Sequence, residues 1–336
     1  MQIRTIDAHV GGQPLRLIVE GAPSANGRTA PALRDWLKSR RDHVRRGVVL
    51  EPRGHRDMTA GLLTLPSSPG AHAGLVFMDA HGYPDLSGHG VMGAAVIAIE
   101  RGLLTSADLG DPEVRLVFDT PAGGVHVRAR VEDRGTSRHV DTVSLTNVPA
   151  FVHRASHPAR AGGREVRVDI AYGGAFFAIV DTEAVGVPLT AAALPDLRRV
   201  GVDLLAALNS GETVVHPVFP PARGVSGVIF TGPPHDPEAH LRNVTITLGG
   251  IADRSACAAG TSAVMAVLDA MGLLPDEQSF VHEGLSGSLL RGRTVQRTLV
   301  GDLPAIVTEI EGSVWITGEH TFLFDEDDPF REGFEI

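Results

Sequence analysis

Residues 85–104 read Asp-Leu-Ser-Gly-His-Gly-Val-Met-Gly-Ala-Ala-Val-Ile-Ala-Ile-Glu-Arg-Gly-Leu-Leu, and residues 253–274 read Asp-Arg-Ser-Ala-Cys-Ala-Ala-Gly-Thr-Ser-Ala-Val-Met-Ala-Val-Leu-Asp-Ala-Met-Gly-Leu-Leu. The two stretches look like copies, since their glycines fall at matching places and both end in Gly-Leu-Leu. Ser87 stands where the single cysteine of the chain, Cys257, stands in the other copy. Two equivalent stretches indicate one small ligand gripped from two sides, and the exchange of Ser for Cys indicates that the sides differ chemically.

Each matched stretch predicts a buried helix. Val91–Arg101 and Thr261–Met271 are apolar on nearly all faces, which is typical of a helix inside a core. Gly102 and Gly272 follow as C-cap signals.

The rest of the chain predicts mainly short strands, because runs rich in Val, Ile and Phe are bounded by Gly, Pro or Asp. The predicted strands are Gln2–Ala8, Leu15–Val19, Gly47–Glu51, Leu75–Met78, Val114–Asp119, Gly124–Val131, Thr142–Asn147, Glu165–Ala171, Phe176–Val180, Gly227–Phe230, Asn243–Thr247, Phe280–His282, Ser288–Arg291, Ala305–Glu309 and Ser313–Gly318. Two further helices, Ala30–Arg45 and Leu189–Asn209, each precede one of the matched stretches. The order of elements therefore repeats, which indicates an old duplication.

These elements predict an α+β fold of two pseudo-symmetric lobes, each a curled, mostly antiparallel sheet around one central helix. We expect lobes at residues 1–158 and 159–319, with residues from about 320 to 336 returning to the first lobe. Val152–Gly163, rich in Arg, His, Ala and Gly, is the predicted crossover. The N-termini of both central helices are expected to face a cleft between the lobes, where the active site would lie.

Composition narrows the class of protein. A chain of 336 residues with 43% hydrophobic residues is long enough for two globular domains. Its net charge of −10 argues against a nucleic-acid partner. One cysteine excludes an internal disulfide, and the absence of a signal peptide or long apolar run predicts a cytoplasmic protein without a membrane span. The basic runs at residues 40–41 and 45–46 are interpreted as a solvated helix face.

No metal or cofactor signature is present. The 15 histidines form no His-Glu-x-x-His motif, no cysteine cluster exists, and the Gly-Gly pairs match no nucleotide or phosphate loop. His9, His55 and His216 lie near Gly or Pro motifs and are interpreted as mainly structural or solvent-exposed. Phe176 and Phe177 are predicted core residues of a strand.

The chemistry centres on the two helix starts. A helix N-terminus offers unpaired N–H groups and a positive dipole end, so two such ends can hold one carboxylate. The same location lowers the pKa of a cysteine, which makes Cys257 the candidate base. Ser87 is by its local pattern an N-cap, but its equivalence to Cys257 makes it the second candidate catalytic residue, which could donate a proton or hold a water. An alcohol has a pKa of roughly 15, about six units above a thiol, so Ser87 needs a neighbour such as His89 to take its proton.

Six ordered motifs between about residues 3 and 334 resemble those of the proline racemase superfamily. They are Asp7–Pro14, Glu51–Met58, Asp85–Gly90, Tyr172–Phe177, Asp253–Cys257 and Asp327–Phe330. The resemblance implies a fold of the diaminopimelate epimerase type and a site that uses no cofactor. It implies a small imino-acid substrate, whose carboxylate is held by backbone N–H groups and whose α-proton is moved by two cysteines on opposite faces. The residues so implied are Gly88, His89, Ala258 and Ala259 for the carboxylate, and His89 and Asp253 for the imino nitrogen.

The chain departs from that pattern at two places. Ser87 replaces the first cysteine, and a Pro-Cys-Gly-Thr-Gly pattern reads Ala-Cys-Ala-Ala-Gly at 256–260. Relatives that lack one cysteine resemble trans-3-hydroxy-L-proline dehydratases, some of which also epimerise 4-hydroxyproline. The leading hypothesis is therefore a hydro-lyase acting on trans-3-hydroxy-L-proline, and the runner-up is a 4-hydroxyproline 2-epimerase. A third hypothesis is a non-catalytic imino-acid binding protein. The oligomeric state stays open, with a homodimer as one option.

Overall fold

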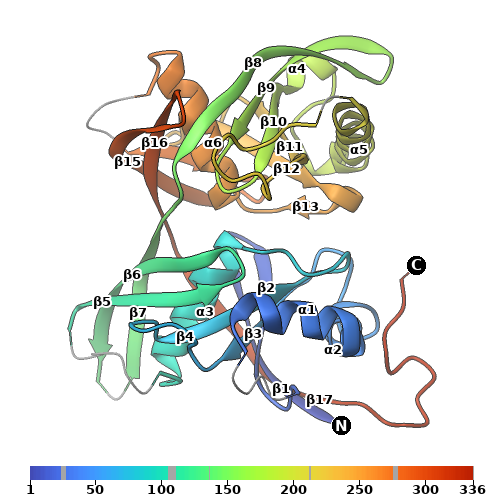
Figure 1. Cartoon of the computed structure of the whole chain (residues 1–336), viewed down its shortest axis with the longest axis vertical. Coiled ribbons are helices and arrows are strands. Elements are labelled where there is room, and N and C mark those ends of the chain that lie inside the picture. The colour runs from blue at the N-terminus through green and yellow to red at the C-terminus, as the bar shows by residue number, and fades with distance from the viewer. Residues whose placement is uncertain (24–27, 105–110, 136, 212, 275–278, 336) are drawn as a thin grey trace. The chain divides into compact units, whose positions relative to one another are not determined.

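The computed structural model describes residues 1–23, 28–104, 111–135, 137–211, 213–274 and 279–335, and shows the predicted α+β fold (Figure 1). The chain forms two compact units. Unit 1 comprises Met1–Leu145 and Gly312–Ile336, and unit 2 comprises Thr146–Glu311. The divisions come earlier in the chain than the boundaries expected after residues 158 and 319. Across the described ranges, no helix combines the length and apolarity needed to cross a membrane.

Unit 1 is a sheet with one helix at its centre. Its strands are β1 (Gln2–Val10), β2 (Gln13–Glu20), β3 (Thr59–Thr64), β4 (Ala73–Met78), β5 (Glu113–Thr120), β6 (Gly123–Arg134), β7 (Ser137–Thr146) and β17 (Val314–Leu323). Its helices are α1 (Ala30–Arg40), α2 (Asp42–Val49) and α3 (Gly88–Glu100). The last strand, β17, pairs antiparallel with β1, so the end of the chain completes the unit in which the chain begins. Helix α3 packs against β1, β2, β3, β6 and β17.

Unit 2 has the same plan. Its strands are β8 (Ala150–Ala161), β9 (Arg164–Tyr172), β10 (Phe176–Asp181), β11 (Val225–Gly232), β12 (Leu241–Thr247), β13 (Ala252–Asp253), β14 (Phe280–Glu283), β15 (Leu289–Val300) and β16 (Leu303–Gly312). Its helices are α4 (Thr182–Val185), α5 (Leu194–Ser210) and α6 (Ala258–Ala270), with 3₁₀ turns at Ala191–Ala193 and Leu248–Gly250. Helix α6 packs against β8, β9, β10 and β15, and β16 pairs with β8 to close the sheet.

Strand pairing shows the duplication directly. In unit 1, β2 and β3 are parallel, β3 and β4 antiparallel, β4 and β5 parallel, and β5 and β6 antiparallel. In unit 2 the same sequence of pairings joins β10, β11, β12, β14 and β15. The partner of β1 is β17, and the corresponding partner of β9 is β8. The repeated element order predicted from the sequence is therefore a repeated topology.

Two histidines lie at equivalent positions, one beside the parallel pair β4–β5 and one beside the parallel pair β12–β14. The backbone N–H of His72 donates to the carbonyl of Val117 (2.8 Å), and its Nδ1 accepts the N–H of Val117 (3.0 Å). His240 makes the same two bonds with Val281, both at 2.9 Å. Each histidine extends a short parallel pairing, β4–β5 or β12–β14, by one side chain. We call each of these histidine–valine pairs a histidine clamp. Because the two clamps are equivalent, they give a residue-by-residue correspondence between the sequences of the two units.

The carboxylates that follow are also equivalent. Asp119 accepts backbone N–H groups from Ser67 (2.7 Å) and Ser68 (2.8 Å). Glu283 accepts them from His235 (2.7 Å) and Asp236 (3.1 Å). In unit 1, a carboxylate of β5 therefore holds the loop that leads into β4. In unit 2, a carboxylate of β14 holds the loop that leads into β12.

The predicted burial of the two central helices holds for most of their length and fails at the C-terminal ends of the predicted ranges, where Arg101 and Met271 are exposed. Every residue from Gly90 to Ile99 of α3 is buried, and in α6 the run Gly260–Val267 is buried. Gly102 and Gly272 end the helices with positive φ of 61° and 69°, a conformation that glycine adopts without a Cβ clash.

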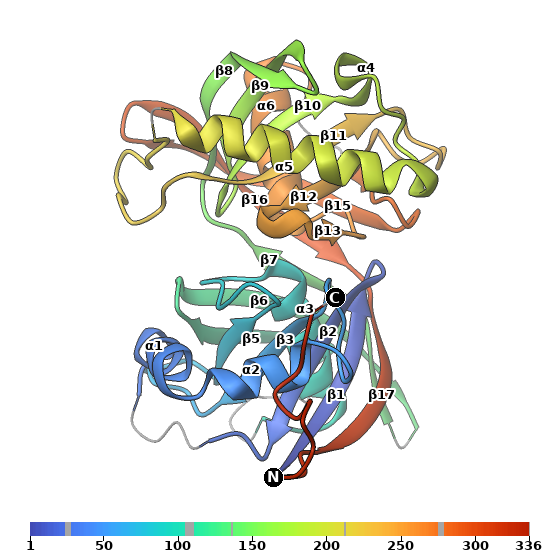
Figure 2. The same cartoon turned by 90° about the vertical axis from the view of Figure 1, so that its right-hand side faces the viewer.

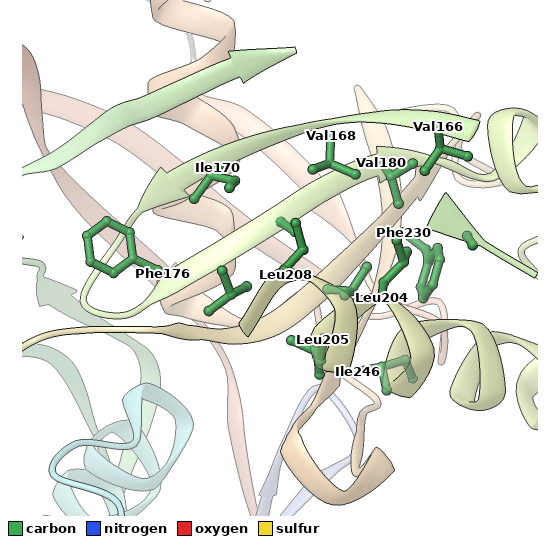
Figure 3. Close-up of a cluster of buried hydrophobic side chains, with 14 of the residues drawn as sticks. Val166, Val168, Ile170, Phe176, Val180, Leu204, Leu205, Leu208, Phe230 and Ile246 are labelled. Atoms are coloured by element: carbon green, nitrogen blue, oxygen red, sulfur yellow. The ribbon is translucent and has the colours of Figure 1, made fainter. Parts of the chain in front are cut away.

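The core of unit 2 is formed where α5 crosses the sheet (Figure 2). Figure 3 shows its apolar side chains meeting those of the strands: Leu204, Leu205 and Leu208 from α5 face Val180, Phe230 and Ile246. Full burial of each such side chain contributes about 1.5–3 kcal/mol. Phe176 and Phe177, predicted as core residues, are 1% and 4% exposed.

Four local predictions are wrong. The helix predicted over Ala30–Arg45 is two helices that meet at Arg41, whose φ of −140° is not helical, and α2 occupies most of the predicted strand Gly47–Glu51. Helix α5 starts at Leu194, after a 3₁₀ turn, rather than at residue 189. The predicted crossover Val152–Gly163 is mostly strand β8.

The solvated-face interpretation is wrong for Arg45. This side chain is buried, pairs with Asp42 at 2.7 Å, and donates to the carbonyls of Asp79 (2.9 Å) and Ala80 (2.6 Å). Its charge therefore joins α2 to the end of β4 instead of facing solvent.

Candidate active site

Ser87 caps α3 in unit 1. Its Oγ accepts the N–H of Gly90 (3.2 Å), and its carbonyl accepts the N–H of Val91 (2.9 Å). The Nδ1 of His89 lies 3.3 Å from the same Oγ. Gly88 and His89 occupy the first two helical positions, whose N–H groups precede the intrahelical ladder. Ser87, Gly88 and His89 are all half-buried.

Cys257 caps α6 in unit 2 in the same way. Its Sγ accepts the N–H of Gly260 (3.4 Å), and its carbonyl accepts the N–H of Thr261 (2.7 Å). Ala258 and Ala259 take the first two helical positions. Ser87 and Cys257 thus stand at equivalent points of equivalent helices, which is the correspondence inferred from the sequence.

The backbone differs between the two caps. Ser87 is extended, with φ of −135°, whereas Cys257 has φ of 58° and ψ of 106°. A residue with a Cβ pays a steric penalty at positive φ, and such strain persists only where the surroundings fix it. The groups around Cys257 must therefore hold its backbone in this conformation.

On one side of Cys257 lies Asp253, which is 8% exposed and belongs to β13. Its Oδ1 accepts both the N–H (2.9 Å) and the hydroxyl (2.7 Å) of Ser255. The Ser255 Oγ in turn accepts the N–H of Cys257 (3.1 Å). A chain of hydrogen bonds thus ties the carboxylate to the backbone of the cysteine.

The predicted lowering of the Cys257 pKa is wrong for this structure. Burial, and then the negative charge of Asp253, raise the pKa of the thiol. The hydrogen bond from Gly260 at the helix N-terminus acts in the opposite direction and is outweighed. The resting side chain is therefore a neutral thiol at neutral pH, and the helix end alone does not make it a thiolate.

Beneath Cys257 lies a buried polar network that the sequence analysis missed. Asn243 Nδ2 and Thr261 Oγ1 both donate to the carbonyl of Ala256, each at 3.0 Å. His282 joins the two donors, with its Nε2 2.7 Å from Asn243 Nδ2 and its Nδ1 2.9 Å from Thr261 Oγ1. Burial lowers the pKa of His282 to about 3, so the ring is neutral. Aligning the two halves of the sequence by their histidine clamps would have shown polar residues here opposite apolar ones.

Close packing at these helix starts leaves no room for a Cβ at two glycines. A Cβ on Gly173, which precedes β10, would lie 2.2 Å from the carbonyl oxygen of Ala259 and 2.7 Å from the nitrogen of Ala263. A Cβ on Gly90 would lie 2.4 Å from the ring of Phe77.

The three histidines weighed in the sequence have local partners. Nδ1 of His9 accepts the N–H of Gly12 (3.3 Å), and Nδ1 of His55 accepts that of Asp57 (3.2 Å). His216 is 7% exposed and packs edge-on against Tyr172, with ring centroids 4.6 Å apart. Among the described residues, no three His, Cys, Asp or Glu side chains are grouped as a metal ion requires.

Comparison with known proteins places this geometry in a family. The sequence profile described as proline racemase matches residues 5–335. The chain belongs to the proline racemase family. It is 35% identical to the proline racemase of Acetoanaerobium sticklandii over 336 residues, covering 99% of this chain and 98% of that protein. It is also 35% identical to the trans-3-hydroxy-L-proline dehydratase of Azospirillum brasilense over 335 residues, covering 99% and 98% of the two chains.

A solved structure agrees. The hydroxyproline epimerase from Agrobacterium vitis, with bound trans-4-hydroxy-L-proline, superimposes with a TM-score of 0.88 at 30% identity, covering 100% of this chain and 95% of that one. The family thus contains isomerases that act on proline and hydroxyproline as well as lyases.

Proposed function

We propose that this chain is a cofactor-independent trans-3-hydroxy-L-proline dehydratase. The observation that carries the proposal is the inequality of two equivalent caps: Cys257 presents a thiol at the start of α6, and Ser87 presents an alcohol at the start of α3. For the unperturbed groups, making an alkoxide costs on the order of 8–9 kcal/mol more than making a thiolate, because the reference pKa values differ by about six units. One strong base favours a reaction that needs only one.

Elimination from trans-3-hydroxy-L-proline is such a reaction. The 3-hydroxyl is trans to the carboxylate and so shares a ring face with the α-hydrogen. The thiolate of Cys257 takes the α-proton, the C2–H electron pair forms the C2=C3 double bond, and the C3–O bond breaks as the hydroxyl takes a proton from an acid on the same ring face and leaves as water. The enamine then tautomerises to Δ1-pyrroline-2-carboxylate. Racemisation, by contrast, requires proton transfer on both faces.

The same proposal assigns the binding groups. The backbone N–H groups of Gly88 and His89 at the start of α3, and of Ala258 and Ala259 at the start of α6, would hold the carboxylate. Asp253 and His89 would meet the imino nitrogen. His216, packed on Tyr172, would line the pocket for the ring.

Substrate binding would also activate the base. The charge of Asp253 contributes to the high pKa of the Cys257 thiol. A cationic imino nitrogen beside Asp253 would cancel that charge, so the thiol pKa would fall when the substrate is bound. The thiol would therefore ionise more readily in the complex than at rest.

The test is to incubate the purified protein with trans-3-hydroxy-L-proline and to follow the cyclic imine by its coloured adduct with aminobenzaldehyde. Imine should form with the native chain and fall by at least ~10³-fold with Cys257→Ala. Ser87→Ala is the matched control, since it removes the opposite cap and should retain imine formation. Substrate binding without turnover in the native chain would refute the proposal and support an imino-acid binding protein.

A second candidate is a 4-hydroxyproline 2-epimerase. The similarity to the Agrobacterium vitis epimerase supports it, and so does the 3.3 Å separation of Ser87 Oγ and His89 Nδ1, which offers a proton path on the second face. Incubation of trans-4-hydroxy-L-proline in D2O decides between the two, because an epimerase places deuterium at the α-carbon of a cis-D product.

A further inference from the structure

The residues of unit 1 that are equivalent to the polar network beneath Cys257 lie beneath Ser87. They occupy the same positions in the fold, but they are apolar. The histidine clamps make Leu75 equivalent to Asn243, since each stands third after its histidine, and make Phe118 equivalent to His282, since each follows the clamped valine. The N-caps make Val91 equivalent to Thr261, since each N–H bonds to the carbonyl of its cap.

All six of these side chains have no exposed surface: Leu75, Val91, Phe118, Asn243, Thr261 and His282. Unit 1 therefore fills this layer with apolar groups and unit 2 fills it with polar ones. Unit 1 shows that the fold needs no polar group here, and burying polar groups costs free energy unless all are satisfied. Because only unit 2 replaces the apolar side chains by polar ones, we expect the polar side chains to have a role that is specific to unit 2.

The hydrogen bonds of these three side chains indicate what that role is. In the arrangement that satisfies the donors, His282 Nδ1–H donates to Thr261 Oγ1, whose hydroxyl donates to the Ala256 carbonyl, while Asn243 Nδ2 donates to both that carbonyl and His282 Nε2. Two donors thus fix one carbonyl oxygen. It belongs to the peptide that enters Cys257, the residue held at positive φ.

We infer that Asn243, Thr261 and His282 are positioning residues that hold the Ala256–Cys257 peptide, and through it the Sγ that faces the Gly260 N–H. The inference rests on the proposed role of Cys257 as the base. The three side chains reach the thiol only through the backbone, so they act on its placement and ionisation and take no part in the proton transfer.

The test replaces the donors by the residues that unit 1 has in the same places. Asn243→Leu/Thr261→Val removes both donors to the Ala256 carbonyl with little change in volume. We expect kcat for imine formation to fall on the order of 100-fold while KM stays within about threefold, as for a misplaced catalytic group. Loss of the Gly260 contact should raise the thiol pKa, so alkylation by iodoacetamide at about pH 8 should slow roughly 10-fold.

Alkylation separates this inference from the proposed function. Cys257 is the only cysteine, so mass spectrometry reads its pH profile whatever the substrate is. Thr308→Val is the matched control: it removes a buried hydroxyl of unit 2 that bonds Ser262 at 2.7 Å, away from Ala256. The single variant Thr261→Ser, which keeps the hydroxyl that donates to the Ala256 carbonyl, should retain the native alkylation profile. The inference is overturned if the double variant has the same alkylation profile as Thr308→Val.

Discussion

Acidification should destabilise unit 2 through His282. The ring has no exposed surface, and burial lowers its pKa from 6.5 to about 3. A protonated ring would turn an Nε2–H toward the amide of Asn243, which already donates to that nitrogen. Between pH 6.5 and 3 the unfolded chain therefore binds a proton that the folded chain does not. The stability is fully present above pH 6.5 and is lost as the pH falls toward 3.

The magnitude follows from that shift. A change of about 3.5 units at about 1.4 kcal/mol per unit gives about 5 kcal/mol when the titration is complete. At about pH 4.5 roughly 3 kcal/mol should already be lost. That is a large fraction of the stability of a typical domain, so the effect should be visible in an ordinary urea titration.

The two units carry separate reporters. Trp36 and Trp315, the only tryptophans, both belong to unit 1, and Cys257 belongs to unit 2. Tryptophan fluorescence and labelling by dithiodipyridine, a reagent that works in acid, can therefore be followed in urea at about pH 7.5 and 4.5. The variant Asn243→Leu/Thr261→Val/His282→Phe gives unit 2 the apolar layer of unit 1 and should lack this loss. Equal acid sensitivity of Cys257 labelling in both proteins would refute the reasoning.

Three further outcomes are expected. Ser87→Cys should raise the ratio of epimer to imine at least ~10-fold, because it supplies a second thiol; an unchanged ratio would mean that Ser87 is only a cap. Gly173→Ala should cost about 1–3 kcal/mol in urea, because its Cβ would fall 2.2 and 2.7 Å from backbone atoms of α6, whereas Gly211→Ala, with open space around it, should be nearly neutral. Asp253→Asn should lower the pKa of Cys257 and speed its alkylation at a given pH, and slower alkylation would contradict the assigned cause.

The fold could be predicted from the sequence where a signal repeats. The two Gly-Leu-Leu helices and most strands follow from apolar runs between turn residues, and the duplicated order follows from them. The local sequence pattern gives the wrong secondary structure where tertiary packing determines whether a segment is a helix or a strand. Val44 and Val48 lie four apart on α2 and are fully buried, but the run from Val48 to Leu50 also reads as a strand. The sequence of β8 predicts a crossover instead of a strand, because two bulges interrupt the pairing of β8 with β9 and hide its periodicity.

For the candidate site, the sequence located the helix starts but not what supports them. Ser87 and Cys257 are recognisable because their flanking glycines match. Asn243, Thr261 and His282 come from β12, α6 and β14, and no local pattern links them. The pKa of Cys257 was also beyond reach, because it depends on burial and on the distance to Asp253 rather than on the helix start alone.

The position of β17 bears on the order in which the protein is made. Unit 2 is continuous from 146 to 311, so its strands are synthesised before β17. Unit 1 lacks β17, which pairs with β1 along nearly its whole length, until the last stretch of the chain is available. The edge of β1 is consequently unpaired during synthesis, and unpaired edges invite association with other strands. The later unit should therefore fold first, and the unit that begins the chain should be the last to become complete.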